Sequence, residues 1–476
     1  VGTLFFTILL ARYLLPEAYG IYNLALSVIL LFLTLSSLGL DNVVTKYISS
    51  VLLKKKHQLS SYNIYFLKLK LKLTTLSLLL LFLAAYPLSR YIFKINELFF
   101  LLIIGSLYLL FQTFESYFTQ LFYCIEKTKY TSYKEIINQL LKLVFLFLIL
   151  IFFRSSLWVI LIFITLGFTS LILLIYDLIT LKKILPELFS KEYHEKIETK
   201  NILKFIWFLS FASISAIIFS HVDSLMLGSF LAPEYVGYYK AAFSFVMGVG
   251  GIIAFPNLIL YPIFSKMHIN NIEDLQNKSV KYMSIVIIPA MFGLLALGRY
   301  FIVFLFGMDY YNSYLPLAIL SFLILPHIFV GQFISIFTAE EKPKIITTLM
   351  IIISILNVVL NYIFIKIFIS FSPLLATAGV SLATVMSWYI YLFITFRMLK
   401  KELLIKVNYH YLLKPLLASL GMYATLFLII RTISDMNIPW GILLILIGIL
   451  VYLVGLILLK GIKKEDLNLI RDGLKK

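Results

Sequence analysis

The sequence predicts an all-α, polytopic membrane protein with about 14 transmembrane helices, arranged as two parallel six-helix lobes plus two C-terminal helices. Three observations support this fold class. Of the 476 residues, 61% are hydrophobic and only 13% are charged, and the mean hydropathy is +0.99. The apolar residues form many runs of about 20, the length that crosses a hydrocarbon core as a helix. Finally, one motif occurs twice in the chain.

The duplicated motif reads PEAYGIYNLALS at Pro16–Ser27 and PEYVGYYKAAFS at Pro233–Ser244. Its Pro, Glu, Gly, Tyr, Ala and Ser recur at an offset of 217 residues. A second pair of similar segments, Glu126–Lys129 and Glu341–Lys344, recurs at an offset of 215. Two matches at nearly one offset predict a duplicated half of the chain rather than a chance motif.

The apolar runs predict the individual helices. The first half gives Val1–Leu15, Ile21–Leu40, Leu71–Phe93, Leu98–Phe122, Ile136–Phe153 and Leu157–Leu178. The second half gives Leu203–Leu227, Tyr238–Phe264, Tyr282–Phe306, Tyr314–Phe337, Ile345–Ile369 and Leu375–Met398, and two more helices follow at Tyr411–Ile433 and Pro439–Leu459. We therefore expect an N-lobe at residues 1–200, a C-lobe at 201–405 and a C-terminal region at 406–476. The repeat offset places the expected start of the first helix about 16 residues before Val1, so we expect the first half of this helix to be missing.

Lysine and arginine predict the orientation in the membrane. Of the 41 in the chain, 32 lie in the C-terminal tail and in the loops after each even-numbered helix, and 8 lie in the alternate loops. Cytoplasmic loops are enriched in these residues, so both termini are predicted to be cytoplasmic. The same asymmetry explains the net charge of +18 without a nucleic-acid partner. Six helices per repeat give both lobes the same orientation, as in transporters built from parallel repeats.

The duplicated motif and its flanks resemble a known family. The stretch ARYLLPEAYGIY at Ala11–Tyr22, with SLGLD at Ser37–Asp41 and the following Lys46-Tyr47, resembles the Wzx-type polysaccharide flippases of the multidrug/oligosaccharidyl-lipid/polysaccharide exporter superfamily. The second half resembles the family through DSLMLG at Asp223–Gly228, with Pro233, Gly237, Tyr239 and Ala242. One departure is Leu15, where the family usually has glycine.

This resemblance implies a MATE-like fold and a transport function in the plasma membrane. The substrate would be an oligosaccharide on a polyprenyl (pyro)phosphate carrier, flipped from the cytoplasmic to the outer leaflet for surface polysaccharide or glycan synthesis. Membrane lipids, and glycosyltransferases or a polymerase of the same pathway, are further expected partners. We expect no cofactor and no enzymatic activity, since the sequence contains neither a Walker A loop nor an HExxH motif. An ion-coupled drug or cation antiporter on the same scaffold and a membrane glycan polymerase or ligase are the alternatives.

Ionisable residues inside predicted helices are candidates for function because they are costly in a membrane. Glu115 shares one helix face with Gln112, Ser116 and Thr119, and Lys142 lies on the next helix. Both lie roughly 16–20 Å from the loop that joins their helices, so we expect that they can pair. The sequence leaves open whether such a pair is structural or belongs to a polar stripe that faces a cavity. Asp41 is similarly either a solvated helix end or part of a cavity wall.

Further candidates are Arg12, at the outer end of the first predicted helix, and His221 and Asp223, at the outer end of the seventh. We expect Arg12, Lys142 and Lys240 to bind the phosphate-bearing head group, because arginine and lysine form charge-assisted hydrogen bonds to phosphate. Asp223, His221, Glu115 and Asp41 are candidates for a coupling proton or cation. Tyr22 and Tyr239 are candidates for stacking on sugar rings. The structural alternatives are side chains that extend to the interface and local ion pairs for the charged residues, and interface anchoring for the tyrosines.

Overall fold

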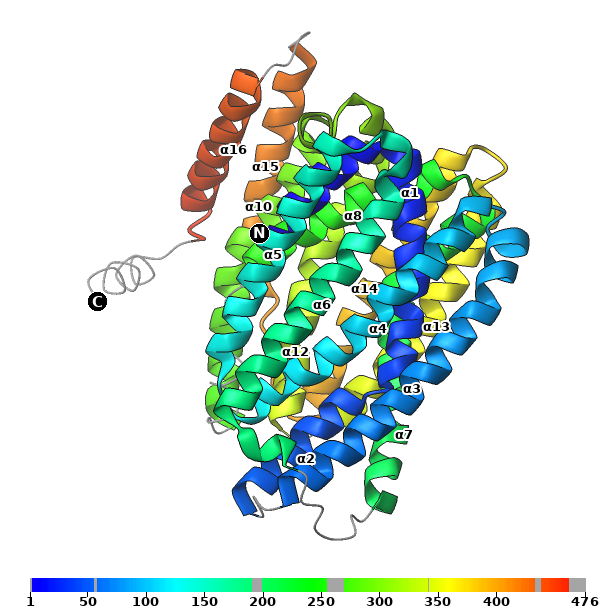
Figure 1. The fold of residues 1–476 in the computed structure, drawn as a ribbon. Helices are drawn as coiled ribbons and strands as arrows, with labels where there is room; N and C mark the ends of the chain where they lie inside the picture. The colour runs from blue at the N-terminus through cyan, green and yellow to red at the C-terminus, as the bar shows by residue number, and fades with distance from the viewer. Residues whose placement is uncertain are drawn as a thin grey trace. The chain divides into compact units, whose positions relative to one another are not determined.

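The structure is a computed structural model, and it describes residues 2–54, 58–190, 199–254, 269–340, 342–432 and 438–461. Within these ranges every regular element is a helix (Figure 1). Thirteen of these helices are long and apolar enough to cross a membrane. The all-α, multi-pass class predicted from the sequence is therefore confirmed.

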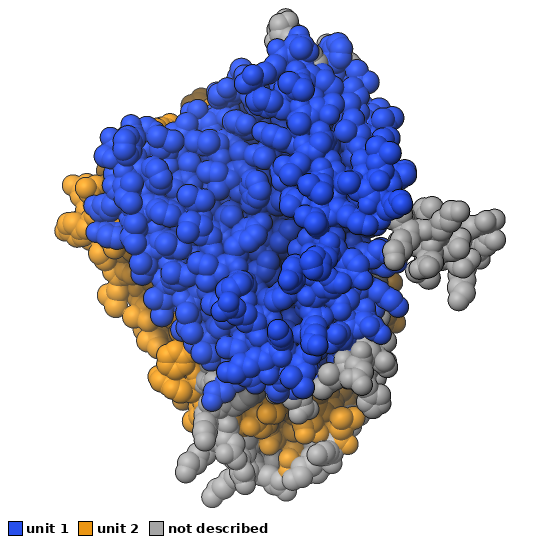
Figure 2. Space-filling model, turned by 180° about the vertical axis from the view of Figure 1, so that it is seen from behind, with its two compact units in different colours: residues 1, 238–476 blue, residues 2–237 orange. Residues whose placement is uncertain are grey.

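The chain divides into two compact units (Figure 2). We call Gly2–Gly237 the N-terminal unit and Tyr238–Lys476 the C-terminal unit; Figure 2 draws them in orange and blue. This division rests on packing, whereas the lobe boundaries expected at residues 200 and 405 rest on the duplication. The lobe boundaries therefore stay predictions.

The N-terminal unit is a bundle in which α1 and α4 each contact several other helices. Helix α4 packs along α6, and α1 contacts α3, α4 and α7. The elements are α1 (Gly2–Ser37), α2 (Leu40–Lys54), α3 (Leu59–Pro87), η2 (Leu88–Ile92), α4 (Asn96–Cys124), α5 (Thr128–Phe152), η3 (Ser155–Leu157), α6 (Trp158–Ile184), η4 (Pro186–Phe189) and α7 (Thr199–Phe230).

In the C-terminal unit, α13 packs on α14, and α15 packs on both α10 and α16. The elements are α8 (Pro233–Ile253, whose first five residues belong to the N-terminal unit), α10 (Ile269–Phe306), η5 (Met308–Ser313), α11 (Tyr314–Leu320), η6 (Ser321–Leu323), α12 (Ile324–Ala339), α13 (Pro343–Phe368), α14 (Pro373–Glu402), α15 (His410–Thr432) and α16 (Ile438–Leu458). The end of the predicted Tyr238–Phe264 helix, from residue 255, lies outside the described residues.

Helix α1 combines the first two predicted helices, which meet at Leu15. Leu15 has φ 63° and ψ 166°, so the helix is broken there, and Figure 1 shows α1 turning along its length. A positive φ is adopted readily only by glycine, which accounts for the glycine that the resembling family usually carries at this position. Pro16 follows and begins the second arm, where its missing N–H costs no helical hydrogen bond.

Several helices begin earlier than the sequence predicts, among them α10, which begins at Ile269 rather than at Tyr282. The stretch after Leu40 was expected to be a loop up to Leu71, but it forms α2 and the first turns of α3. Helix α5 likewise begins at Thr128 rather than at Ile136. Residues Val44, Ile48 and Val51 recur at helical spacing on α2 and are all buried, which gives this helix an apolar face.

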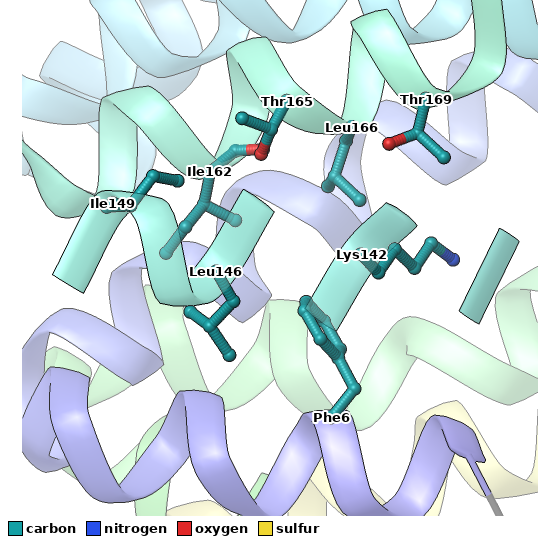
Figure 3. A pocket seen from close by; sticks show the side chains of 8 residues that line it. All are labelled: Phe6, Lys142, Leu146, Ile149, Ile162, Thr165, Leu166 and Thr169. Atoms are coloured by element: carbon teal, nitrogen blue, oxygen red, sulfur yellow. The ribbon is translucent and has the colours of Figure 1, made fainter. Parts of the chain in front are cut away.

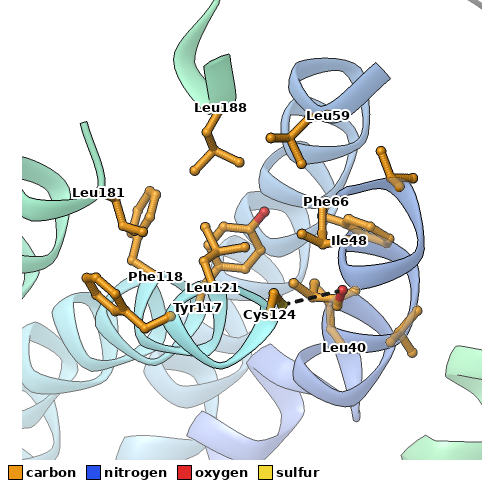
Figure 4. Close-up of a cluster of buried hydrophobic side chains, with 14 of the residues drawn as sticks. Leu40, Ile48, Leu59, Phe66, Tyr117, Phe118, Leu121, Cys124, Leu181 and Leu188 are labelled. Atoms are coloured by element: carbon orange, nitrogen blue, oxygen red, sulfur yellow. Dashed lines mark hydrogen bonds between the residues drawn. The ribbon is translucent and has the colours of Figure 1, made fainter. Parts of the chain in front are cut away.

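The apolar face of α2 packs into a buried cluster at one end of the N-terminal unit (Figure 4). The cluster joins α2, α3, α4, α6 and η4, through residues that include Leu40, Ile48, Leu59, Phe66, Tyr117, Phe118, Leu121, Cys124, Leu181 and Leu188. The Tyr117 hydroxyl donates to Asn63 Oδ1 at 2.7 Å, and Asn63 Nδ2 donates to the Leu188 carbonyl at 3.1 Å. This cluster fixes the helix ends that border the polar cavity described next.

Candidate functional site

A polar cavity of about 470 Å³ lies within the N-terminal unit. Its walls come from α2, α4, α5 and α6, and most of the lining side chains carry a hydroxyl, amide or charged group. The lining residues are Asp41, Gln112, Glu115, Ser116, Thr119, Gln120, Tyr123, Thr131, Ser132, Lys134, Glu135, Asn138 and Leu173. A cavity of this size and polarity inside membrane-spanning helices is a candidate binding site.

Three buried charged groups from three helices meet at one wall of this cavity. Lys134 of α5 forms ion pairs with Glu115 of α4 and with Asp177 of α6, whose Oδ2 lies 3.3 Å from Lys134 Nζ. These residues are 6%, 5% and 0% exposed, respectively. Two carboxylates therefore share one ammonium group in a region that water hardly reaches. We call Glu115, Lys134 and Asp177 the charged triad.

Neighbouring polar side chains hold the carboxylates of the triad. Thr119 donates to Asp177 Oδ2 at 2.9 Å and also contacts Lys134 Nζ. Gln112 Nε2 donates to Glu115 Oε2 at 2.5 Å, and Ser170 donates to Gln112 Oε1 at 3.0 Å. Within the described chain, Asp177 Oδ1 is buried without a hydrogen-bond partner. The triad thus retains one carboxylate oxygen whose hydrogen-bonding capacity is unused.

A second ion pair lies beside the cavity. Lys70 of α3 donates to Asp41 Oδ1 at 3.1 Å and to Ser37 Oγ at 2.7 Å. The Lys70 side chain is fully buried, whereas the Asp41 side chain is 31% exposed and lines the cavity. Asp41 lies in the first turn of α2 and also lines the cavity, so its position agrees with both interpretations that the sequence left open.

The expected pairing of Glu115 with Lys142 is wrong, because the structure pairs Glu115 with Lys134. Glu115 lies about 13 Å from the end of α4, and Lys134 lies about 9 Å from the start of α5. Lys142 is about 21 Å from the start of α5, one to two turns beyond the level of Glu115. Lys142 instead borders a separate small cavity of about 10 Å³, between Phe6 of α1 and Thr169 of α6 (Figure 3).

The structure places the remaining candidates of the N-terminal unit as follows. Arg12 is exposed on the first arm of α1. Asp223 of α7 is buried, and His221 Nδ1 lies 3.1 Å from Ser27 Oγ of α1. Tyr22 is buried, with its ring 5.4 Å from that of Phe163 and 6.3 Å from that of Tyr19. These ring contacts give Tyr22 a role in packing.

In the C-terminal unit, both candidates from the second copy of the motif are buried. The rings of Tyr239 and Phe243 stack with centroids 5.8 Å apart. Lys240 Nζ lies 5.3 Å from the centre of the Phe243 ring, a cation–π contact. On α13 of the same unit, the buried Asn361 donates from Nδ2 to Asn357 Oδ1 at 3.2 Å, an amide pair that the sequence analysis did not single out.

Three buried charged residues, Lys70, Lys134 and Asp177, were not among the candidates predicted from the sequence. Asp177 had a usable signal, since it is an acidic residue inside the predicted Leu157–Leu178 helix. The two lysines were assigned to loops, because the helices that carry them begin earlier than hydropathy predicts. Both lysines can be buried because each forms an ion pair with a carboxylate on another helix.

Comparisons with known proteins identify the family and the fold. A family model described as polysaccharide biosynthesis protein matches residues 3–268, more than half of the chain. No curated protein matches the sequence. Among solved structures, the chain is similar to a lipid II flippase MurJ in an inward closed conformation, with a TM-score of 0.73 and 19% identity over 95% of both chains.

Two transporters of related fold are also similar. One is an inward-facing multidrug resistance MATE family transporter of the MOP superfamily, with a TM-score of 0.62 and 11% identity over 85% of this chain and 95% of that one. The other is the Vibrio cholerae MATE transporter VcmN, with a TM-score of 0.52 and 13% identity over 85% of this chain and 99% of that one. At these identities the structural likeness shows the fold, and the family model shows the membership. The chain is a multi-pass membrane protein that belongs to the polysaccharide biosynthesis protein family and has the fold of the flippases and multidrug transporters it resembles.

Proposed function

We propose that this protein flips an oligosaccharide linked to a polyprenyl (pyro)phosphate from the cytoplasmic to the outer leaflet of the plasma membrane. The observation that carries the proposal is the polar cavity of about 470 Å³ within membrane-spanning helices. Its hydroxyl, amide and carboxylate groups can replace the water that sugar hydroxyls lose on leaving the cytoplasm. The lipid tail remains in the bilayer while the head group crosses by alternating access between the two faces.

The reaction is movement without a change in covalent bonds, so the protein acts as a transporter rather than an enzyme. Arg12, Lys142 and Lys240 are the proposed contacts of the phosphate groups, because each can supply charge-assisted hydrogen bonds. Tyr22 and Tyr239 remain proposed sugar contacts, reached only in a conformation that exposes their rings. Both termini are proposed to be cytoplasmic, and glycosyltransferases or a polymerase of the same pathway are the proposed partners.

Energy for directional movement would come from an ion gradient, with Asp223, His221, Glu115 and Asp41 as the proposed coupling residues. The charged triad favours Glu115 among them. Glu115 and Asp177 share one lysine, so protonation of either carboxylate, or binding of a cation beside it, would remove an uncompensated buried charge.

A second candidate function is ion-coupled export of drugs or other cations. It is favoured by the number of carboxylates at the cavity, where Asp41, Glu115 and Glu135 line the wall and Asp177 lies directly behind it. Acidic cavity residues attract cationic substrates. The two functions differ in the substrate that crosses the membrane, so one transport experiment can separate them.

The experiment uses the purified protein in liposomes that contain a fluorescent polyprenyl-pyrophosphate oligosaccharide in both leaflets. A glycosidase added outside cleaves the substrate that reaches the outer leaflet. We expect protein-dependent cleavage beyond the outer-leaflet fraction. Ser116→Trp should abolish it by filling the cavity, and Ser155→Trp, on an exposed residue outside the cavity, should retain it. Absence of cleavage with or without an ion gradient, together with gradient-driven uptake of small cations, would establish the antiporter instead.

A further inference from the structure

The polar cavity carries an excess of negative charge. Six charged side chains line it or pair directly with a lining residue, and four of these are carboxylates. Lys70 neutralises Asp41, and Lys134 is shared by Glu115 and Asp177. The fourth carboxylate belongs to Glu135. Four carboxylates therefore face two ammonium groups at this wall, and Lys142, outside the lining, interacts with Glu135 and Glu115 only through space.

Glu135 is the most accessible of these carboxylates. It is exposed, whereas Glu115 and Asp177 are buried in the charged triad. Its hydrogen-bond partners are the neutral amides of Gln139, at 2.5 Å from Oε1, and Asn138, at 3.4 Å from Oε2. Among the described residues, no lysine or arginine forms an ion pair with Glu135. Lys142, the next lysine along α5, is two turns or about 10 Å away.

The position of Glu135 is fixed by contacts on both sides. Its neighbour Lys134 is held in the charged triad, which sets the rotation of α5. Gln139, which donates to Glu135, also donates from Nε2 to Thr3 Oγ1 of α1 at 3.0 Å. The Gln139 amide thus holds the Glu135 carboxylate at the cavity wall through one hydrogen bond and ties α5 to α1 through another.

We propose that the cavity of the N-terminal unit accepts glycans without acidic groups, and that Glu135 is the residue that excludes acidic sugars. A uronic acid or a phosphate placed at this wall would meet a carboxylate of the same sign and be repelled by it. Neutral and amino-substituted sugars can instead donate hydroxyl or ammonium hydrogens to Glu135, Asp41 and the amides. The pyrophosphate of the carrier is therefore bound outside this cavity. This inference rests on the proposed function, whose substrate class it narrows.

The first test measures the charge of the cavity and does not depend on transport. Ser132 lines the cavity one turn before Glu135, and Ser132→Cys allows labelling with a cationic and an anionic methanethiosulfonate reagent in detergent. The parent chain, whose single cysteine Cys124 is buried, gives the background. Relative to Ser155→Cys at an exposed site elsewhere, we expect the cationic reagent to be favoured about 10-fold.

Adding Glu135→Gln to Ser132→Cys should lower this preference by about threefold, and high salt should also reduce it. Glu97→Gln, which removes an exposed carboxylate on α4 outside the cavity lining, should leave it unchanged. Equal labelling by the two reagents in Ser132→Cys, or a preference that Glu135→Gln leaves unchanged, would overturn the proposal.

The second test uses the flipping assay with two lipid-linked oligosaccharides of equal length, one neutral and one with a uronic acid in place of a hexose. We expect the neutral substrate to be flipped at least about 10-fold faster, and Glu135→Lys to reverse the preference. Equal flipping of both substrates would refute the specificity and leave the proposed function intact. Loss of flipping for both substrates, with the labelling preference retained, would refute the proposed function and leave the charge of the cavity established.

Discussion

Gly20 and Pro233 are in direct backbone contact: a Cβ atom on Gly20 would lie 1.8 Å from the Pro233 carbonyl oxygen. The contact is reciprocal, since a Cβ on Gly237 would lie 2.0 Å from the carbonyl oxygen of Pro16. Each glycine belongs to one copy of the duplicated motif, and each proline belongs to the other copy. The two copies of the motif therefore meet at these residues, and glycine allows the two backbones to approach each other.

Replacing Gly20 or Gly237 by alanine should destabilise the protein by about 1–3 kcal/mol or prevent folding, because the added methyl group overlaps a carbonyl oxygen that cannot move freely. Thermal unfolding in detergent measures the effect. The matched control is Gly421→Ala on α15, where a Cβ would meet no atom within 4 Å, and we expect a change within about 1 kcal/mol there. Equal stability of all three variants would contradict the packing role.

Lys134→Met should lower the stability by about 3–5 kcal/mol, because Glu115 and Asp177 would both lose their counter-charge while remaining buried. Asp177→Asn should cost less, since Lys134 and Glu115 still pair. Combining Lys134→Met with Asp177→Asn and Glu115→Gln should recover part of the loss, a coupling measured by comparing unfolding temperatures. Lys127→Met, in the exposed turn before α5, is the control, and strict additivity among the triad variants would argue against a shared ion pair.

The ion pair between Lys70 and Asp41 should respond asymmetrically to mutation. Asp41→Asn leaves a lysine whose side chain is fully buried, whereas Lys70→Met leaves a carboxylate that is 31% exposed at the cavity. Desolvation penalises the buried charge more, so Asp41→Asn should lower the unfolding temperature more than Lys70→Met. The reverse order would indicate that the Asp41 carboxylate is the less hydrated partner.

Substitutions of Tyr22 can distinguish a role of its ring in packing from a role in binding sugar. Because its ring packs on Phe163 and Tyr19, Tyr22→Ala should cost about 3–5 kcal/mol and Tyr22→Phe much less. Unfolding temperature and flipping rate are measured on the same preparations. A variant with Ala at this position that keeps its stability but loses flipping would instead assign Tyr22 to substrate binding.

The orientation predicted from lysine and arginine can be tested with introduced cysteines. Lys129→Cys, at the start of α5, should be protected in intact cells from a membrane-impermeant thiol reagent and should react after lysis. Glu97→Cys, in the first turn of α4 and thus at the opposite end of that helix from the α4–α5 turn, should react in intact cells. Labelling of Lys129→Cys from outside would invert the predicted topology.

The sequence alone determined the membrane class, the duplicated motif and the family, because each can be read from the order of the residues without knowledge of their contacts in space. A run of about 20 apolar residues specifies a spanning helix without reference to its neighbours. Helices α5 and α13 start at Thr128 and Pro343, within the two repeated segments, and these starts keep the repeat offset of 215 residues. The recurrence of Gly20 as Gly237 could be read from the sequence. The backbone contact that requires glycine at these positions could not.

The tertiary structure decided which charges are buried and which partners they have. The hydropathy pattern placed Lys70 and Lys134 in loops outside the membrane, because an isolated lysine is costly inside it. The cost is offset by carboxylates on other helices, such as Asp41, 29 residues from Lys70, and Asp177, 43 residues from Lys134. No local pattern contains these pairs, since they depend on the rotation and the relative height of packed helices. For the same reason, Glu115 forms its ion pair with Lys134 and not with Lys142, and Glu135 lies at the cavity wall with no ion-pair partner among the described residues.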